Sequence, residues 1–267
     1  MKEKIYLGKE SKCIPYQYET CSSVGHPHEP VTPFITKTTI QRKECFLYKG
    51  PISNKVMDLC TIDPETKQSP SVFITGSSHS HNFSPVFDKI RNDFGIGVSI
   101  LAVNGCDFDP LLLFENKGNT CVDSNKNRIL FIKNNAKEGD ILFTGITYYE
   151  KYKQDSVEKI AEIARDKKIN VIYFTPIPRW ERLKPSLDAV CKKESEKQWF
   201  RISRKKQCGL YSEISRKTYN KSNKILDSLK IIEQSYPNFH VFPIHEVLCD
   251  SNKCPSHIKG IRLYRDN

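Results

Sequence analysis

The stretch VFITGSSHSH, residues 72–81, is the one on which the fold prediction rests. Four apolar or β-branched residues run into Gly76, and serines then alternate with histidines up to His81. A continuous apolar run is typical of a parallel strand that is covered on both faces. Glycine allows a sharp bend at the end of the strand because it has no Cβ. We therefore expect a buried strand with polar side chains at its carboxyl end.

Similar apolar runs and helical patterns alternate along the rest of the chain. Strands are expected at residues 98–105, 140–145, 170–176 and 238–243, and helices at 84–95, 155–168 and 213–234. The helix at 84–95 is expected to take Ser84 as its N-cap and Pro85 as its first helical residue. Alternating strands and helices predict right-handed βαβ crossovers. The predicted fold class is α/β, a three-layer α/β/α sandwich with a mostly parallel sheet.

The cysteines indicate the redox environment. The chain has 10 cysteines in locally paired spacings, and none forms a CxxC motif. Such a set favours disulfides and an oxidising compartment over a zinc site. Proximity in sequence suggests the pairs Cys106–Cys121, Cys191–Cys208 and Cys249–Cys254. Reduced, mostly buried thiols in a cytosolic protein are the alternative.

Residues 1–70 differ in character from the rest of the chain. They are rich in proline, contain four of the cysteines and show little periodicity. We expect an irregular, disulfide-tied lead-in over residues 1–70 and the α/β domain over residues 71–267. No apolar run reaches the roughly 20 residues of a membrane helix, so no transmembrane segment is predicted in this chain. The first residues also lack the apolar core of a secretion signal.

The formal net charge of +11 raises the question of an anionic partner. The lysines are scattered, with one dense patch at residues 191–208. A solvated surface is the ordinary interpretation, and attraction to an anionic glycan or membrane surface is the next. We expect no nucleic-acid partner, because no nucleic-acid-binding motif is present.

Ser78 is the candidate nucleophile. In a three-layer α/β domain, ligands bind at the carboxyl ends of the parallel strands. A serine at this position can direct its hydroxyl into the crevice while backbone N–H groups face a developing oxyanion. Gly-Ser-Ser after a strand is also an ordinary turn and helix cap, so the motif needs support from elsewhere in the chain.

That support comes from a resemblance at both ends of the domain. FITGSSHS (residues 73–80) resembles the GDSH block of SGNH-type hydrolases, especially the SGNH domains that follow acyltransferase-3 membrane domains in bacterial sugar O-acyltransferases. LCDSNKCPSHIKGIRLYRDN, at the C-terminus, resembles the close of those domains, where a cysteine-bounded loop leads to an Asp-x-x-His motif. TPIPRW (175–180) fits a proline segment at a strand end. The resemblance covers roughly residues 70–267 and implies an SGNH/flavodoxin-like fold.

The resemblance assigns roles residue by residue. Ser78 corresponds to the nucleophile and Asp266 to the aspartate of Asp-x-x-His. Gly105 corresponds to the glycine whose N–H helps to form the oxyanion hole, and Thr147 lies near the place of the family asparagine. Ser77 departs from the pattern, because the family usually has aspartate there.

The histidine of Asp-x-x-His would fall two positions beyond Asn267, the last residue. In a serine hydrolase this imidazole takes the proton of the nucleophile. We expect the chain to be truncated within the motif. The alternatives are that another histidine, such as His81, serves as the base or that the domain is not catalytic.

The function implied by the resemblance is acyl transfer onto a cell-envelope polysaccharide or lipopolysaccharide, most simply O-acetylation. No cofactor is implied, and no metal is predicted from the histidine pairs at 26–28 and 79–81. The implied partner is an acyltransferase-3 membrane domain, fused or separate, and the expected location is periplasmic or extracytoplasmic, next to the membrane. The rival functions are a free-standing carbohydrate esterase and a non-catalytic glycan-binding or accessory module. A cytosolic polyanion binder is the last alternative.

Overall fold

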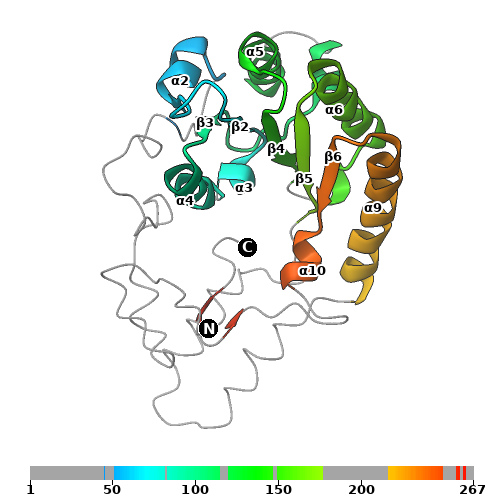
Figure 1. Cartoon of the computed structure of the whole chain (residues 1–267). Coiled ribbons are helices and arrows are strands. Elements are labelled where there is room, and N and C mark those ends of the chain that lie inside the picture. Colours follow the sequence, from blue (N-terminus) through cyan, green and yellow to red (C-terminus); the bar gives the residue numbers. More distant parts are fainter. Residues whose placement is uncertain are drawn as a thin grey trace, which may run out of the picture. The chain divides into compact units, whose positions relative to one another are not determined.

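The computed structural model describes residues 45, 51–81, 83–114, 120–146, 149–176, 216–248, 257–258 and 261–262 (Figure 1). The chain divides into two compact units. The larger consists of Thr36–Ile177 and Ser222–Ile244 and contains the main sheet. Within the smaller unit, strands β7 (His257–Ile258) and β8 (Ile261–Arg262) pair antiparallel.

The main sheet has six strands in the order β1-β3-β2-β4-β5-β6, and all of them are parallel except β1, which pairs antiparallel with β3. The strands are β1 Thr61–Ile62, β2 Ser71–Ile74, β3 Gly97–Ile100, β4 Ile141–Gly145, β5 Asn170–Phe174 and β6 Phe239–Phe242. All five predicted strands are confirmed. The strand predicted at 98–105 ends at Ile100, because the chain then turns back on itself at the bridge between Val103 and Cys106.

The strand order places a topological switch point in the middle of the sheet. The chain runs outward from β2 to β3 on one side, and then from β4 through β5 to β6 on the other. β2 therefore pairs with both β3 and β4. In open α/β sheets of this kind, the crevice at such a point lies outside the carboxyl ends of the strands. In this chain, Gly76 and Ser78 follow β2 at that point.

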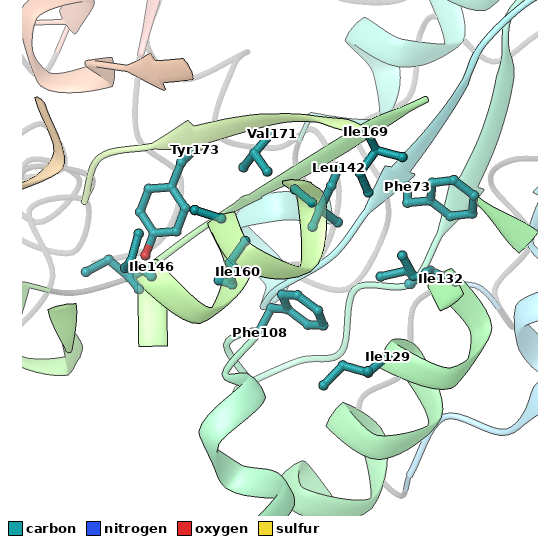
Figure 2. Packing of buried hydrophobic residues seen from close by; sticks show 14 of the residues in the cluster. Phe73, Phe108, Ile129, Ile132, Leu142, Ile146, Ile160, Ile169, Val171 and Tyr173 are labelled. Carbon is teal, nitrogen blue, oxygen red and sulfur yellow. The ribbon is translucent and has the colours of Figure 1, made fainter. Parts of the chain in front are cut away.

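Helices cover both faces of the sheet. The helices that the structure describes are α2 Asn54–Leu59, α3 Ser78–His81, α4 Ser84–Phe94, α5 Thr120–Asn135, α6 Gln154–Lys167, α9 Arg216–Ser235 and α10 Ile244–Leu248, with 3₁₀ turns η2 Pro110–Phe114 and η3 Tyr149–Lys151. On one face, Phe73, Leu142 and Val171 pack with side chains of α5 and α6 (Figure 2). Side chains of α9 belong to the same apolar cluster. On the other face, Val72 and Ile74 pack with Phe87 of α4. Burial on both faces accounts for continuous rather than alternating apolar strands. The three-layer α/β/α prediction is confirmed.

Two local predictions differ from the structure. The N-cap of α4 is Phe83, which makes no side-chain cap, and Ser84 is already helical. Its Oγ instead donates to the carbonyl of His81 at 2.6 Å and joins α4 to α3. Residues 54–62, which the sequence analysis places in the irregular lead-in, form α2 and the edge strand β1. The division of the chain at residue 70 stays a prediction.

The structure also contains a helix that the sequence analysis did not predict, α5. Its buried side chains include Ser124, Asn125 and Arg128 beside Ile129 and Ile132. Three polar residues on the inward face interrupt the apolar period by which an amphipathic helix is recognised. Asn125 and Arg128 of this cluster hydrogen-bond to the turns that follow β3 and β2.

The described part of the chain contains two disulfides, Cys45–Cys60 and Cys106–Cys121. The predicted pair Cys106–Cys121 is confirmed, and the other two predicted pairs lie outside the described residues. Among the helices that the structure describes, none is both long enough and apolar enough to span a bilayer.

Candidate active site

The turn after β2 carries the candidate nucleophile. Gly76 has φ 111°, and a Cβ at this position would collide with Ser80 Oγ. Ser77 is buried, with 3% of its surface exposed, and its Oγ accepts a hydrogen bond from the N–H of His79 at 3.4 Å. Its carbonyl accepts from the N–H groups of Ser80 (3.0 Å) and His81 (3.3 Å). Ser78 therefore begins a short helical turn, and its side chain is partly exposed. Residues 76–81 form the first turn of the candidate site.

The second turn, residues 103–109, follows β3 and carries Gly105. The N–H of Val103 donates to the carbonyl of Gly76 at 2.9 Å, so the two turns lie side by side. Gly105 is exposed with φ 74°, and a Cβ at this position would meet nothing within 4 Å. Cys106, next to it, is joined by the disulfide to Cys121 of α5. The structure thus brings two predicted site residues, Ser78 and Gly105, to the same edge of the sheet.

A buried arginine connects the two turns. Arg128 is 0% exposed, and its Nη1 donates to the carbonyls of Gly76 (3.0 Å) and Cys106 (3.3 Å). Its Nη2 donates to the carbonyls of Cys106 (3.4 Å) and Asp107 (3.2 Å) and to Asn125 Oδ1 (3.0 Å). Burial lowers the pKa of Arg128 to about 9, and the negative charge of Asp107 opposes this shift. The guanidinium remains charged at neutral pH.

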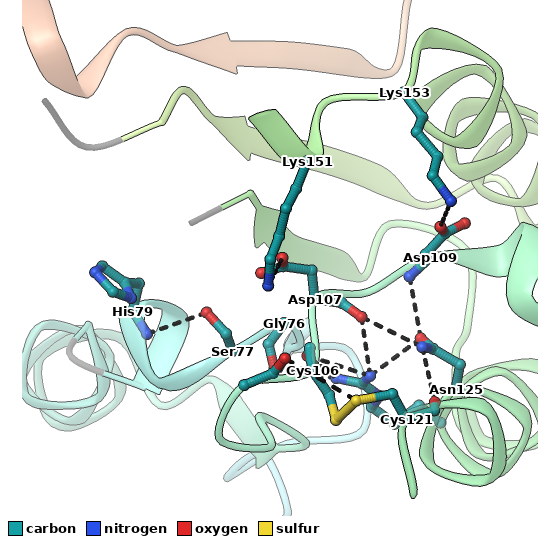
Figure 3. A network of polar contacts seen from close by, with 12 residues as sticks. Gly76, Ser77, His79, Cys106, Asp107, Asp109, Cys121, Asn125, Lys151 and Lys153 are labelled. Atoms are coloured by element: carbon teal, nitrogen blue, oxygen red, sulfur yellow. Dashed lines mark hydrogen bonds and ion pairs between the residues drawn. A yellow bond between two sulfur atoms is a disulfide. The ribbon is translucent and has the colours of Figure 1, made fainter. Parts of the chain in front are cut away.

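Two ion pairs lie on the outer side of the second turn. Lys151 Nζ, on η3 after β4, is 3.1 Å from Asp107 Oδ2, and Lys153 Nζ is 3.2 Å from Asp109 Oδ2 (Figure 3). Both carboxylates are largely buried, whereas both ammonium groups are about half exposed. Asp109 is also fixed by Ser156 Oγ, which donates to it at 2.8 Å. The pairs attach the second turn to the segment after β4.

His81 lies on α3 with Ser78, three residues further on. Residues at this spacing lie on the same side of a helix. Desolvation by burial lowers the pKa of His81 from 6.5 to about 4, so its imidazole is neutral at pH 7. A pKa this far below neutral pH also makes the imidazole a weak proton acceptor, which counts against His81 as the alternative base.

Two other predicted site residues, Thr147 and Asp266, lie outside the described residues. Sequence reasoning did not find Arg128 or Asn125. Each lies in α5, far along the chain from the turns it contacts, and neither belongs to a recognisable motif. The buried polar side chains of α5 interrupt its apolar period, so the sequence pattern offered no clear signal for them.

A search of curated proteins found no match. The chain is similar to a solved structure, the periplasmic domain of the lipopolysaccharide acetyltransferase of Salmonella ser. Paratyphi A, at 14% identity over 78% of each chain with a TM-score of 0.46. The family model described as "SGNH domain (fused to AT3 domains)" matches residues 44–267. Because this match covers most of the chain, the protein belongs to the family of SGNH domains that are fused to AT3 domains.

Proposed function

We propose that this chain is a serine O-acyltransferase domain that modifies a cell-envelope polysaccharide, with Ser78 as the nucleophile. Membership in the SGNH family supports an acyl-transfer or esterase function. The observation that carries the residue assignment is the position of Ser78, at the carboxyl end of β2, beside the Gly105 turn and at the switch point of the sheet. A ligand crevice is expected at this point of an open α/β sheet.

The proposed reaction has two balanced steps. Ser78 Oγ attacks the carbonyl carbon of the acyl donor while a base takes the hydroxyl proton. The base passes this proton to the leaving group of the donor, which departs as an acyl ester forms on Ser78. A sugar hydroxyl then attacks this ester and gives its proton to the base, which returns a proton to Ser78 Oγ as the acylated sugar is released. The base is the histidine of the Asp-x-x-His motif, oriented by Asp266, as the family resemblance implies.

The oxyanion of each tetrahedral intermediate needs preorganised donors. The backbone N–H groups of Ser78 and Gly105 are the proposed donors, with Thr147 as a third. Removing one such donor typically costs about 3 kcal/mol of transition-state stabilisation. Both turns are fixed by backbone hydrogen bonds, so little reorganisation is needed during the reaction.

The proposed partner is an AT3 membrane domain, which would supply acyl groups from across the bilayer. The proposed acceptor is a cell-envelope polysaccharide or lipopolysaccharide, and the proposed location is periplasmic or otherwise extracytoplasmic. The disulfides Cys45–Cys60 and Cys106–Cys121 are consistent with an oxidising compartment. No cofactor is needed, because the acyl ester of the donor provides the activation.

The test is hydrolysis of p-nitrophenyl acetate by the domain together with any residues that its gene encodes after Asn267. Ser78→Ala should reduce the rate to background and abolish the acetyl adduct seen by mass spectrometry. Ser80→Ala is the matched control, since Ser80 is two residues away and fully buried and its Oγ has no hydrogen-bond partner among the described residues. It should retain activity.

The outcomes separate the rival functions. Equal rates for Ser78→Ala and the unaltered protein, without an adduct, would contradict the proposal and favour a glycan-binding module. Adding an oligosaccharide acceptor distinguishes transfer from hydrolysis. An acetylated acceptor indicates a transferase, and acetate alone indicates a carbohydrate esterase.

A further inference from the structure

Arg128 is fully buried in the middle of α5, and all of its hydrogen bonds except the one to Asn125 go to residues outside the helix. Its two terminal nitrogens donate to the carbonyls of Gly76, Cys106 and Asp107, which belong to the two turns of the candidate site. Gly76 lies 52 residues from Arg128 in the sequence. One planar guanidinium therefore bridges two loops that come from different strands of the sheet.

A buried guanidinium is costly unless it is well paired. Transfer of an ion from water to a protein interior costs several kcal/mol even after relaxation, and an apolar residue of similar size is often as stable or more so. Arg128 recovers part of this cost from three carbonyls, from Asn125 and from the charge of Asp107. Its ring contact with Phe108, 5.6 Å from the guanidinium carbon to the centroid, adds to the packing. Stability alone gives little reason for an arginine here.

The hydrogen bonds of Arg128 complete those that join the two turns directly. The carbonyl of Gly76 accepts from Val103 N at 2.9 Å and from Arg128 Nη1 at 3.0 Å, so both of its lone pairs are used. The carbonyl of Cys106 accepts hydrogen bonds from both terminal nitrogens of Arg128. Gly76, two residues before Ser78, and Cys106, directly after Gly105, are thus held by the same side chain.

Asn125 fixes the guanidinium in turn. Its Oδ1 accepts from Arg128 Nη2 at 3.0 Å and from Asp109 N at 3.1 Å, while its Nδ2 donates to the carbonyls of Asp107 (3.3 Å) and Cys121 (2.9 Å). Figure 3 shows these contacts converging between the second turn and α5. The amide therefore restrains the same turn that the guanidinium holds.

We propose that Arg128 is a positioning residue that sets the separation and orientation of the Ser78 and Gly105 turns, so that their N–H groups converge on one acyl oxygen. This inference rests on the proposed acyl-transfer function. Arg128 itself does not touch the substrate. It acts through the carbonyls of Gly76 and Cys106, and its geometry requires a planar fork rather than a point charge. Lysine carries the charge but cannot bond two loops in this way.

The test compares Arg128→Lys and Arg128→Met with Ile132→Ala. Ile132 is 1% exposed, lies one turn further along α5 and packs in the apolar core, so it is the control for destabilisation. We expect both Arg128 variants to lower kcat for p-nitrophenyl acetate about 100-fold with little change in KM, the size of effect expected when reacting groups are misplaced by about 1 Å. Ile132→Ala should lower Tm and leave kcat unchanged at temperatures where it is folded.

A second readout does not depend on activity. Hydrogen exchange should become faster in residues 76–81 and 103–109 together in Arg128→Lys, while strands β4 and β5 stay protected. Asn125→Ala provides a milder variant if Arg128→Met does not fold, and the same two segments should exchange faster.

Unchanged kcat and unchanged protection of both turns in Arg128→Lys would overturn the inference. The inference would also be overturned if kcat fell in proportion to Tm, and to the same degree, in Arg128→Lys and Ile132→Ala. If Ser78→Ala proved fully active, the proposed function would fail, whereas the hydrogen-exchange result would still decide whether Arg128 holds the turns.

Discussion

Cys106 and Cys121 form a disulfide that fastens the turn carrying Gly105 to the first turn of α5. The same helix contributes Arg128 to that turn, so a covalent bond and a set of hydrogen bonds restrain one short segment. A disulfide that closes a loop of about 15 residues is worth roughly 3 kcal/mol through its effect on the unfolded chain. In this protein it also restrains a backbone N–H that is proposed to bind the oxyanion.

Removing this disulfide should therefore affect both stability and activity. We expect the Cys106→Ala/Cys121→Ala protein to lose roughly 3 kcal/mol in its free energy of unfolding. We also expect it to show a lower kcat for ester hydrolysis at temperatures where it is folded. Urea denaturation and steady-state kinetics measure the two effects.

The chain offers a matched control for this experiment. Cys45–Cys60 has the same sequence separation of 15 residues but packs in the apolar core on the α4 side. Cys45→Ala/Cys60→Ala should lower stability by a similar amount and leave kcat unchanged. An equal loss of kcat in both double variants would contradict a local role for Cys106–Cys121.

Gly76 should tolerate no side chain. Its φ of 111° is strained for any other residue, and an added Cβ would collide with Ser80 Oγ. Strain of this kind costs on the order of 1–3 kcal/mol, and the collision adds to it. Gly76→Ala should therefore destabilise the protein more than Gly139→Ala, where φ is 88° but no atom lies within 4 Å of the new Cβ.

A double variant separates strain from collision at Gly76. In Gly76→Ala/Ser80→Ala the hydroxyl is gone, although Ser80 Cβ stays 3.4 Å from the new methyl group. Thermal and urea denaturation should show recovery of part of the lost stability but not all of it. No recovery at all would mean that the backbone conformation alone forbids a side chain.

The sequence contained enough information to predict the sheet and one of the two turns. Continuous apolar runs indicate β2 to β6. The turn Gly76-Ser77-Ser78 is recognisable because the block that resembles SGNH-type hydrolases lies at the end of a predicted strand. The strand order was not predictable in the same way, since pairing of β2 with β4 depends on contacts about 70 residues apart.

The polar support of the site was harder to predict for a physical reason. Arg128 and Asn125 become interior residues because α5 packs against the two turns. Apart from the bond between them, their partners are backbone groups, which carry no sequence signal. The same limitation applies to Ser84, which looks like an N-cap but bonds to the carbonyl of His81. Local patterns identify elements, whereas long-range hydrogen bonds decide what individual polar residues do.

Ser77 should be replaceable by the aspartate that the family pattern favours. Its Oγ accepts from the N–H of His79, and a carboxylate oxygen can take the same bond at the start of a helical turn. Ser77→Ala should cost about 1 kcal/mol in the free energy of unfolding, since this capping bond is lost. Ser77→Asp should retain more stability and activity than Ser77→Ala. Urea denaturation with ester hydrolysis tests the order, and a Ser77→Asp protein weaker than Ser77→Ala would contradict it.

His81 should make stability depend on pH in mildly acidic solution. Its folded-state pKa is about 4, below the ordinary value of 6.5, because burial disfavours the charged imidazole. Above pH 6.5 the group is neutral in both states and contributes nothing to the pH dependence. Between pH 6.5 and 4 the unfolded chain binds the proton more readily, so stability falls as the pH is lowered. The full shift corresponds to at most roughly 3.4 kcal/mol.

The measurement is the free energy of unfolding in urea at several pH values from 4 to 8, for the unaltered protein and for His81→Gln. Acidic side chains titrate in both proteins, so the difference between the two curves isolates His81. The unaltered protein should lose stability relative to His81→Gln as the pH drops through this window. His240→Gln, at an exposed position on β6, is measured alongside as a substitution of the same type at the surface. A constant difference between the unaltered protein and His81→Gln from pH 8 to 4 would show that His81 does not lie in a desolvated site.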